Sequence, residues 1–146
     1  ITGDIGTTAA KQRLDGYLQA HRESGTLPSK SLICEGDYSF ESGKAHAQKL
    51  LEAHPDLDGV FASNDLMAMG AITVFENAGK SVPGQIRVVG FDDALIAQTS
   101  RPSLTTVRQD VVALGEAAGS LMIAQLNGQD FEPIILPTEL VIRESA

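Results

Sequence analysis

Two short apolar stretches that stop abruptly at polar residues constrain the fold of this chain more than any other feature. Gly59–Ala62 is followed by Ser63–Asp65, and Ile86–Gly90 is followed by Phe91–Asp93. Both stretches favour β-structure, and ligands of parallel α/β sheets bind just beyond the carboxyl ends of strands. The amide and carboxylates at these two ends therefore predict a polar small-molecule cleft where the strand ends lie side by side.

Helical and strand patterns alternate along the chain, which indicates βαβ units. The sequence therefore predicts an α/β domain with a doubly wound, mainly parallel sheet. We expect helices at 8–23, 39–53, 65–78 and 110–126, a helical turn near 94–98, and strands at 30–34, 59–62, 86–90, 104–108, 134–136 and 140–143.

Composition narrows the classes of partner. The 146 residues can form one compact domain, and the formal net charge of −8 argues against direct binding to nucleic acid. No apolar run approaches the ~20 residues that cross a membrane, so no membrane partner is expected.

The single cysteine, Cys34, is expected to be a buried, inert thiol. The three histidines lack the spacing of a zinc site, so we expect no metal and no cofactor.

The helix that contains Leu66–Phe75 has no charged residue over these ten positions. A helix on the surface of an α/β domain usually has a polar face, so both faces of this one should be buried. Packing within the same chain is one explanation. A subunit interface is the other, because few other elements are available to cover the second face, and Met67 and Met69 suit an adaptable apolar contact.

The polar residues at the strand ends have two possible roles. Asn64 and Asp65 can cap the following helix, and an Asn side chain can also offer a sugar hydroxyl both a donor and an acceptor. Asp92 and Asp93 can shape a turn, or accept hydrogen bonds from ligand hydroxyls. A magnesium site around Asp65, Asp92 and Asp93 would need further ligands.

Two residues from other segments complete the candidate site. Arg13 lies one turn into the first helix, where its guanidinium would reach the strand ends or remain on the surface. Tyr38 follows the strand expected at 30–34 and could stack on a ligand or simply pack. No nucleophile–base arrangement and no phosphate-binding glycine loop is present, so an enzyme is not expected.

Four segments in this order resemble the effector-binding core of the lactose/galactose-repressor family of bacterial transcription regulators. The resemblance spans nearly the whole chain and implies a lobe with the fold of periplasmic binding proteins. The four segments are Arg13–Tyr17, Ala62–Gly70, Pro83–Asp93 and Pro102–Asp110.

The resemblance also implies roles for individual residues. The residues that match Arg13, Asn64 and Asp92 bind the effector in that family, and the match to Tyr38 packs on it. A homodimer contact is implied on the charge-free helix and on the loop near Thr99. The residues implied in that contact are Leu66, Met67, Met69, Gly70, Thr73, Thr99 and Ser100.

By the same resemblance, residues 1–109 form a carboxyl-terminal lobe, 110–138 belong to a second lobe that is mostly outside this chain, and 139–146 return to the first. The implied function is a cytoplasmic repressor that responds to a sugar and binds operator DNA through a domain outside the 146 residues. The chain opens with Ile1-Thr2-Gly3, which reads as the tail of a strand, so we expect a piece of a longer protein. A periplasmic sugar-binding protein of a transport system is the alternative.

Overall fold

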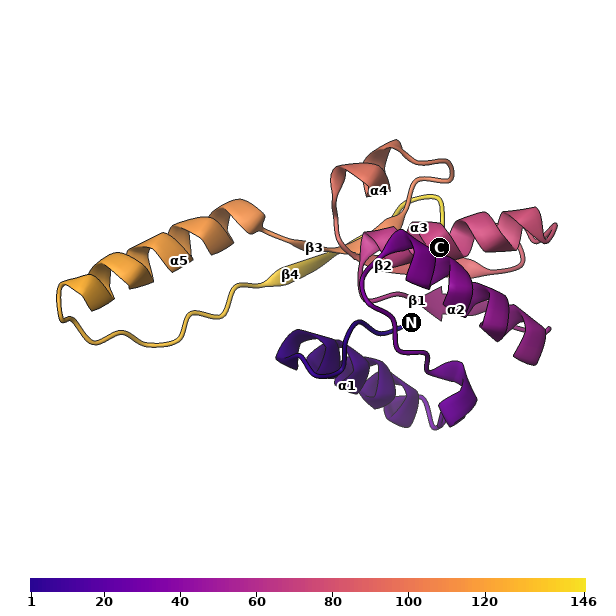
Figure 1. Ribbon diagram of the computed structural model, residues 1–146, viewed down its shortest axis with the longest axis horizontal. Helices are drawn as coiled ribbons and strands as arrows, with labels where there is room; N and C mark the ends of the chain where they lie inside the picture. The colour runs from indigo at the N-terminus through magenta and orange to yellow at the C-terminus, as the bar shows by residue number, and fades with distance from the viewer.

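The computed structural model describes all residues 1–146 and contains one four-stranded sheet with the order β1-β2-β3-β4 (Figure 1). The strands are β1 (Gly59–Phe61), β2 (Arg87–Asp92), β3 (Thr105–Gln109) and β4 (Thr138–Val141). β1, β2 and β3 run parallel, and β4 runs antiparallel to β3. The α/β class and the mainly parallel sheet are confirmed.

Local sequence explains where the helices begin. The helices are α1 (Thr8–Glu23), α2 (Phe40–Ala53), α3 (Asp65–Asn77), α4 (Leu95–Thr99) and α5 (Val111–Leu126), with a short 3₁₀ helix, η1, at Lys30–Leu32. Side chains of Thr7, Ser39, Asn64 and Asp110 each accept a hydrogen bond from a backbone N–H in the first turn of α1, α2, α3 and α5. Such caps satisfy amides that have no partner inside the helix, so these polar residues fix the helix starts.

The core lies where α2 and α3 pack together and where α3 covers one face of the sheet (Figure 1). The close approach of the two helices depends on glycine, because a Cβ at Gly70 would overlap the Phe40 carbonyl and one at Gly43 would overlap the Met67 backbone. The largest fully buried apolar side chains are those of Phe75, Met67, Ile72, Ile86, Leu104 and Val88.

Two residues of the predicted dimer contact lie inside this packing. Met67 is fully buried, and Gly70 is buried against α2. Both residues therefore contact their own chain and have no surface for a partner. The packing of α3 inside the chain explains most of its apolar character, and only Leu66 and the half-buried Met69, Thr73 and Val74 keep apolar surface.

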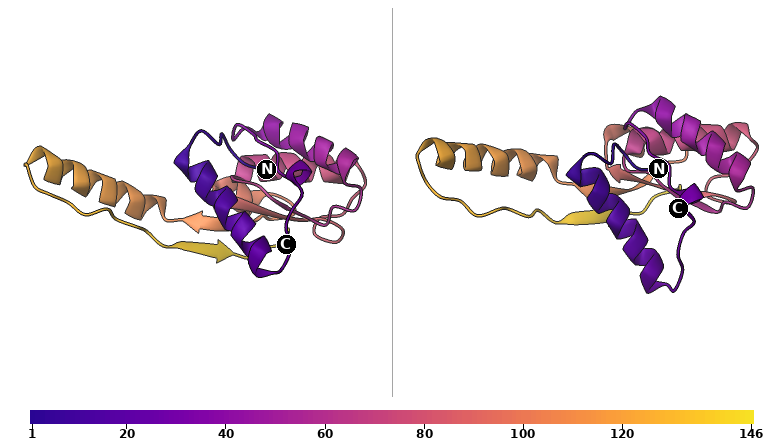
Figure 2. Two further views of the ribbon diagram at one scale, coloured as in Figure 1. Left: turned by 90° about the horizontal axis from the view of Figure 1, so that it is seen from below. Right: turned by 60° about the horizontal axis from the view of Figure 1, so that its bottom comes forward.

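α1 lies on the opposite side of the sheet from α2 and α3 (Figure 2). The Arg13 guanidinium of α1 stacks on the Phe91 ring of β2, 3.8 Å from the ring centroid. The neighbouring residue Gly90 faces Ala68 of α3 instead. Because side chains alternate along a strand, these contacts place helices on both faces of the sheet and confirm the doubly wound arrangement.

Two predicted strands are wrong. Residues 30–34 contain η1 instead, where the Ser29 side chain caps the 3₁₀ turn, and the only pairing nearby is an isolated bridge between Thr2 and Glu35. Cys34 is half-buried rather than buried. Residues 134–136 form no strand. Prolines at 133 and 137 flank them and cannot donate to a ladder, so pairing with β3 begins only at Thr138.

β3 and β4 form a ribbon that carries the chain away from this body to α5 and back (Figure 1). No residue of α5 is buried, although the helix is rich in apolar side chains. No helix of the structure combines the length and apolar character needed to cross a membrane. The large apolar side chains exposed on α5 are Val111, Val112, Leu114, Met122, Ile123 and Leu126.

Candidate functional site

Polar residues stand at the ends of three neighbouring strands, at one edge of the sheet. Asn64 follows β1, Asp92 ends β2 and Gln109 ends β3. Because β1, β2 and β3 are parallel neighbours, their carboxyl ends lie at one edge of the sheet. The structure therefore brings together residues that are far apart in the sequence, in the place where a parallel sheet offers a ligand site.

Arg13 joins this cluster from α1. Its Nη1 donates a hydrogen bond to the Ser63 carbonyl at 2.6 Å, and its Nη2 lies 3.9 Å from Asp92 Oδ1. The side chain is only 16% exposed. Stacking on Phe91 adds a cation–π contact, which holds the guanidinium plane in place. Arg13 is thus fixed beside the strand ends, and a surface position for it is excluded.

Asn64 performs its capping role and keeps some bonding capacity. Its Oδ1 accepts a hydrogen bond from the Met67 N–H at 3.0 Å, and its Nδ2 donates to the Tyr38 carbonyl at 2.9 Å. An Asn amide carries two donor hydrogens and two acceptor lone pairs, so one of each remains after these bonds. The predicted cap is confirmed, and one donor and one acceptor of the amide remain without a protein partner.

Tyr38 adopts a left-handed backbone conformation with φ of 68°. Its ring lies against the Cα of Gly3, where any Cβ would overlap the ring atoms. The side chain is half-buried and packs on the edge of the core. Tyr38 therefore has a packing role in this chain, and only the exposed part of its side chain could reach a ligand.

Asp92 is the carboxylate closest to Arg13. Its side chain is 37% exposed, and Oδ1 accepts a hydrogen bond from Gln109 Nε2 at 2.7 Å. Burial raises the pKa of Asp92 above its usual value, although the Arg13 charge and the Gln109 hydrogen bond oppose the rise. One oxygen of the Asp92 carboxyl is bound to protein, and the other is able to accept ligand hydroxyls.

The other two carboxylates at these strand ends are fully engaged by protein donors. Asp65 is 1% exposed and accepts hydrogen bonds from Thr106 Oγ1 at 2.6 Å and from the Ala94 N–H at 2.8 Å. Asp93 binds the guanidinium groups of Arg108 and Arg143. These partners give Asp65 and Asp93 structural roles and leave no three-carboxylate group arranged to hold a metal ion.

An open cleft of about 590 Å³ lies between α1 and the sheet, next to this cluster. Small-molecule sites usually have volumes of roughly 300–1,000 Å³. Arg13, Phe91 and Gln109 belong to both the cleft and the cluster, whereas Tyr38, Asn64 and Asp92 do not line its wall. The lining residues are Ala9, Gln12, Arg13, Gly16, Tyr17, Phe61, Phe91, Val107, Gln109 and Thr138.

Sequence reasoning missed Gln109 and Phe91. Gln109 ends β3 one residue beyond the predicted strand, and it is the hydrogen-bond partner of Asp92. A polar residue at the end of a third parallel strand is the same signal that identified Asn64 and Asp92, so Gln109 could have been found. Phe91 could not, because only the position of α1 makes it the surface on which Arg13 stacks.

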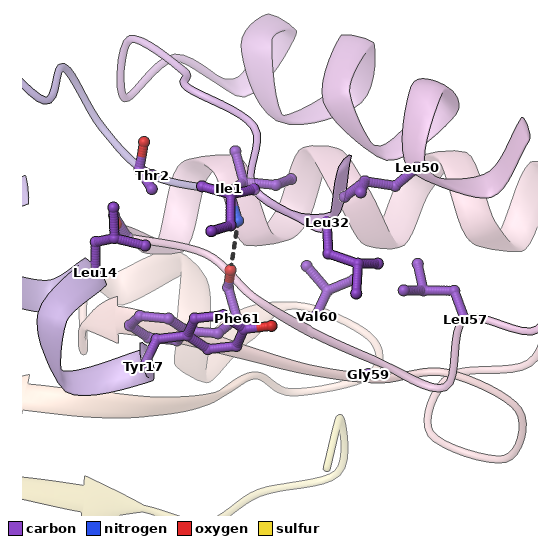
Figure 3. Close-up of a pocket in the computed structure, with 12 residues that line it drawn as sticks. Ile1, Thr2, Leu14, Tyr17, Leu32, Leu50, Leu57, Gly59, Val60 and Phe61 are labelled. Atoms are coloured by element: carbon purple, nitrogen blue, oxygen red, sulfur yellow. Dashed lines mark hydrogen bonds between the residues drawn. The ribbon is translucent and has the colours of Figure 1, made fainter. Parts of the chain in front are cut away.

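A second, smaller cavity is apolar (Figure 3). Its volume is about 50 Å³, and Leu32, Leu50, Leu57 and Val60 contribute to its wall. The Ile1 nitrogen donates a hydrogen bond to the Phe61 carbonyl at 2.7 Å beside it. The cavity is too small and too apolar for a polar effector.

Comparison with known proteins identifies the class. A family model described as a periplasmic binding protein-like domain matches residues 1–146. The chain is 35% identical over 147 aligned positions to the HTH-type transcriptional regulator CelR of Thermobifida fusca, covering 99% of this chain and 43% of that protein. The chain thus spans under half the length of this curated relative.

Solved structures agree with the family model. The transcriptional regulator CelR–cellobiose complex superposes with a TM-score of 0.96 at 35% identity, over 100% of this chain and 45% of that one. The Lac repressor dimer bound to operator and an anti-inducer superposes with a TM-score of 0.89 at 29% identity. The match covers 99% of this chain and 50% of that one. The fold and the matched family define a periplasmic-binding-protein-like domain. Within that class, the chain belongs to the lactose/galactose-repressor family of bacterial transcription regulators.

Proposed function

We propose that this chain is the effector-binding and dimerisation region of a DNA-binding repressor whose effector is a sugar. The observation that carries the proposal is the arrangement of Arg13, Asn64 and Asp92 at one edge of the sheet, each with bonding capacity left over. A sugar hydroxyl both donates and accepts. A guanidinium, an amide and a carboxylate together offer it both kinds of partner.

Each residue of the proposed site has a distinct role in binding the effector. Arg13 donates to ligand oxygens, Asp92 accepts from ligand hydroxyls through its second oxygen, and Asn64 does either. The exposed part of the Tyr38 ring packs against an apolar face of the sugar. CelR, whose cellobiose complex has the same fold, supports a sugar as the ligand class.

The exposed arm supports a two-lobed protein. α5 projects from the body with its apolar side chains uncovered, and apolar surface of this extent is normally buried against another element. We infer that residues 110–138 belong to a second lobe and that residues 139–146 return to the lobe formed by 1–109. The effector would then bind between the two lobes and contact both.

A homodimer contact is proposed on the remaining exposed part of α3. Leu66, Met69 and Thr73 recur at helical spacing and keep exposed surface, and Leu66 is 44% exposed. Thr99 and Ser100 at the end of α4 are the second proposed segment. The operator-bound Lac repressor is a dimer of the same fold, which supports this assembly.

The mechanism follows from the two-lobed arrangement. Effector bound between the lobes favours one relative orientation of the lobes, and in a dimer this changes the spacing of two DNA-reading heads. Effector and operator affinities are then coupled reciprocally, typically by ~1–3 kcal/mol.

The test is calorimetric titration of the full-length protein with cellobiose, ribose and galactose as probes, followed by the Asp92→Ala variant. We expect at least one probe to bind and Asp92→Ala to weaken its binding without lowering the melting temperature. Asp56→Ala, which removes an exposed carboxylate outside the cluster, is the matched control and should bind as wild type. Unchanged affinity in Asp92→Ala would refute the assignment of the site.

A further inference from the structure

Asp93 lies where three segments of the fold converge. It follows β2 directly, and its carboxylate binds Arg108 of β3 and Arg143, which follows β4. β3 and β4 are the two strands of the ribbon that leads to α5. A single carboxylate therefore links the end of β2 to both strands through which the chain leaves and re-enters this body.

The carboxylate of Asp93 is buried and makes two short contacts with arginine side chains. Arg108 Nε donates to Oδ2 at 2.7 Å, and Arg143 Nη2 donates to Oδ1 at 2.5 Å. The Asp93 side chain is 3% exposed and that of Arg143 is 15% exposed. Burial would raise the pKa of Asp93, but the two guanidinium groups outweigh it and lower that pKa below its usual value. Because the side chain is buried and both oxygens bind protein donors, Asp93 is not available to a ligand.

Arg143 extends the connection to the start of β3. Its Nη1 donates to the Leu104 carbonyl at 2.8 Å, and its backbone N–H donates to Thr105 Oγ1 at 2.8 Å. Arg108 also reaches Glu139 of β4 at 3.3 Å, although both of those side chains are largely exposed. The Asp93 cluster thus bonds to β3 near both of its ends and to the returning strand.

The backbone at this point needs such support. Asp92 and Asp93 have φ values of 116° and 59°, in a region that residues other than glycine seldom adopt. Conformations of this kind persist only where surrounding contacts hold them. The following residue is held as well, because the Ala94 N–H donates to the buried Asp65. Asp93 and Asp65 therefore fix the two residues that directly follow Asp92, whose carboxylate faces Arg13.

We propose that Asp93 is a positioning residue that sets the orientation of Asp92 and joins it mechanically to the β3–β4 ribbon. This inference rests on the proposed function, in which Asp92 binds the effector. A shift of the ribbon relative to β2 would move Asp92, and a ligand that fixes Asp92 would in turn restrain the ribbon and α5. Gln109, the last residue of β3, strengthens this link through its hydrogen bond to Asp92.

The deciding variant is Arg143→Gln in the full-length protein, with the Asp92 carboxyl pKa measured by ¹³C NMR titration. Loss of a cation would by itself raise the pKa of Asp92, as would the freed negative charge of Asp93. Loss of position exposes Asp92 to solvent and lowers its pKa toward the usual 3.8. The charge effects can only raise the pKa of Asp92, so a fall would report a change in its position. We expect such a fall, and an unchanged or higher pKa would overturn the proposal.

Controls separate position from charge and from folding. Arg143→Lys keeps the positive charge and a hydrogen-bond donor, so the pKa of Asp92 in this variant should lie closer to the wild-type pKa than it does in Arg143→Gln. Arg22→Gln removes an exposed arginine of α1 and should leave Asp92 unchanged. If Arg143→Gln does not fold, Arg108→Gln replaces it, because Arg108 is 45% exposed and binds only carboxylates. The same fall in pKa is expected there.

Amide hydrogen exchange of Asp93→Asn gives a second readout that needs no effector. Exchange at residues 93–95 and in β4 should rise about 10- to 100-fold, which corresponds to the loss of a charge-assisted hydrogen bond, while α2 and α3 remain protected. If β4 of the Asp93→Asn variant exchanged at the wild-type rate, the proposed link between Asp93 and the ribbon would be contradicted. If instead Asp92→Ala leaves cellobiose, ribose and galactose binding unchanged, the proposed function fails while these two readouts still decide the role of Asp93.

Discussion

Arg13 Nη2 lies 3.9 Å from Asp92 Oδ1, which brings the first helix of the chain to the end of a central strand. The distance is long for a direct hydrogen bond. The two groups thus face each other without being fully satisfied by one another. A ligand oxygen can bind between a guanidinium and a carboxylate placed in this way, and this relationship determines the first prediction.

Arg13→Lys is expected to weaken binding of whichever probe sugar binds the wild type by about 1.5–3 kcal/mol, the typical contribution of a hydrogen bond to a charged group. A lysine keeps the charge but loses the stacking on Phe91 and the second donor direction. Calorimetric titration measures the change. Lys11→Arg, an exchange on the exposed side of α1, is the control and should bind normally. Equal affinities for wild type and Arg13→Lys would show that geometry at Arg13 is unimportant.

Gly70→Ala is expected to destabilise the fold by about 1–3 kcal/mol, because the added methyl would overlap the Phe40 carbonyl and force α2 and α3 apart. Urea unfolding followed by circular dichroism measures the free energy of unfolding. Gly16→Ala is the matched control, since nothing lies within 4 Å of the added carbon. The control should be neutral or stabilising by up to ~1 kcal/mol. A stable Gly70→Ala variant would mean that the two helices separate at little cost.

The buried carboxyl group of Asp65 predicts that the free energy of unfolding depends on pH. Burial raises its pKa above 3.8, and the Thr106 and Ala94 hydrogen bonds only partly oppose this. The folded state therefore holds the proton more tightly than the unfolded state, so this group's contribution to stability falls as pH rises from 3.8 through the folded pKa. We expect the Asp65→Asn variant to lack this pH-dependent contribution to the free energy of unfolding. Urea titrations of both proteins at a series of pH values would measure it. Parallel pH profiles for the two proteins would contradict the direction of the shift.

Leu66→Asp is expected to convert a dimer of the full-length protein to a monomer in sedimentation velocity experiments. Leu66 is 44% exposed on the face of α3 that α2 does not cover, and a carboxylate there would have to be buried at the proposed interface. Leu27→Asp alters an 80% exposed leucine outside that face and should remain dimeric. A dimeric Leu66→Asp protein would move the interface elsewhere.

Local patterns in the sequence predicted most of the secondary structure. Asn64 and Ser39 mark the starts of α3 and α2 because capping is a short-range effect within one turn. The failure at 30–34 has a tertiary cause. A β-favouring segment becomes a strand only if a neighbouring strand pairs with it, and only Glu35 finds such a partner, in Thr2. At 134–136 the apolar residues favoured a strand, whereas the flanking prolines argued against one. The prolines were the correct local indication.

The sequence by itself determined the α/β class, the helix starts and the presence of polar residues after the strands, because each depends on periodicity or on contacts within a few residues. Only the tertiary structure decided how those residues are used. Asp92 and Asp93 are adjacent and chemically identical, yet one faces Arg13 and the other is enclosed by Arg108 and Arg143. That difference arises from the packing of α1, β3 and β4 around the end of β2, which brings together side chains that no local pattern connects.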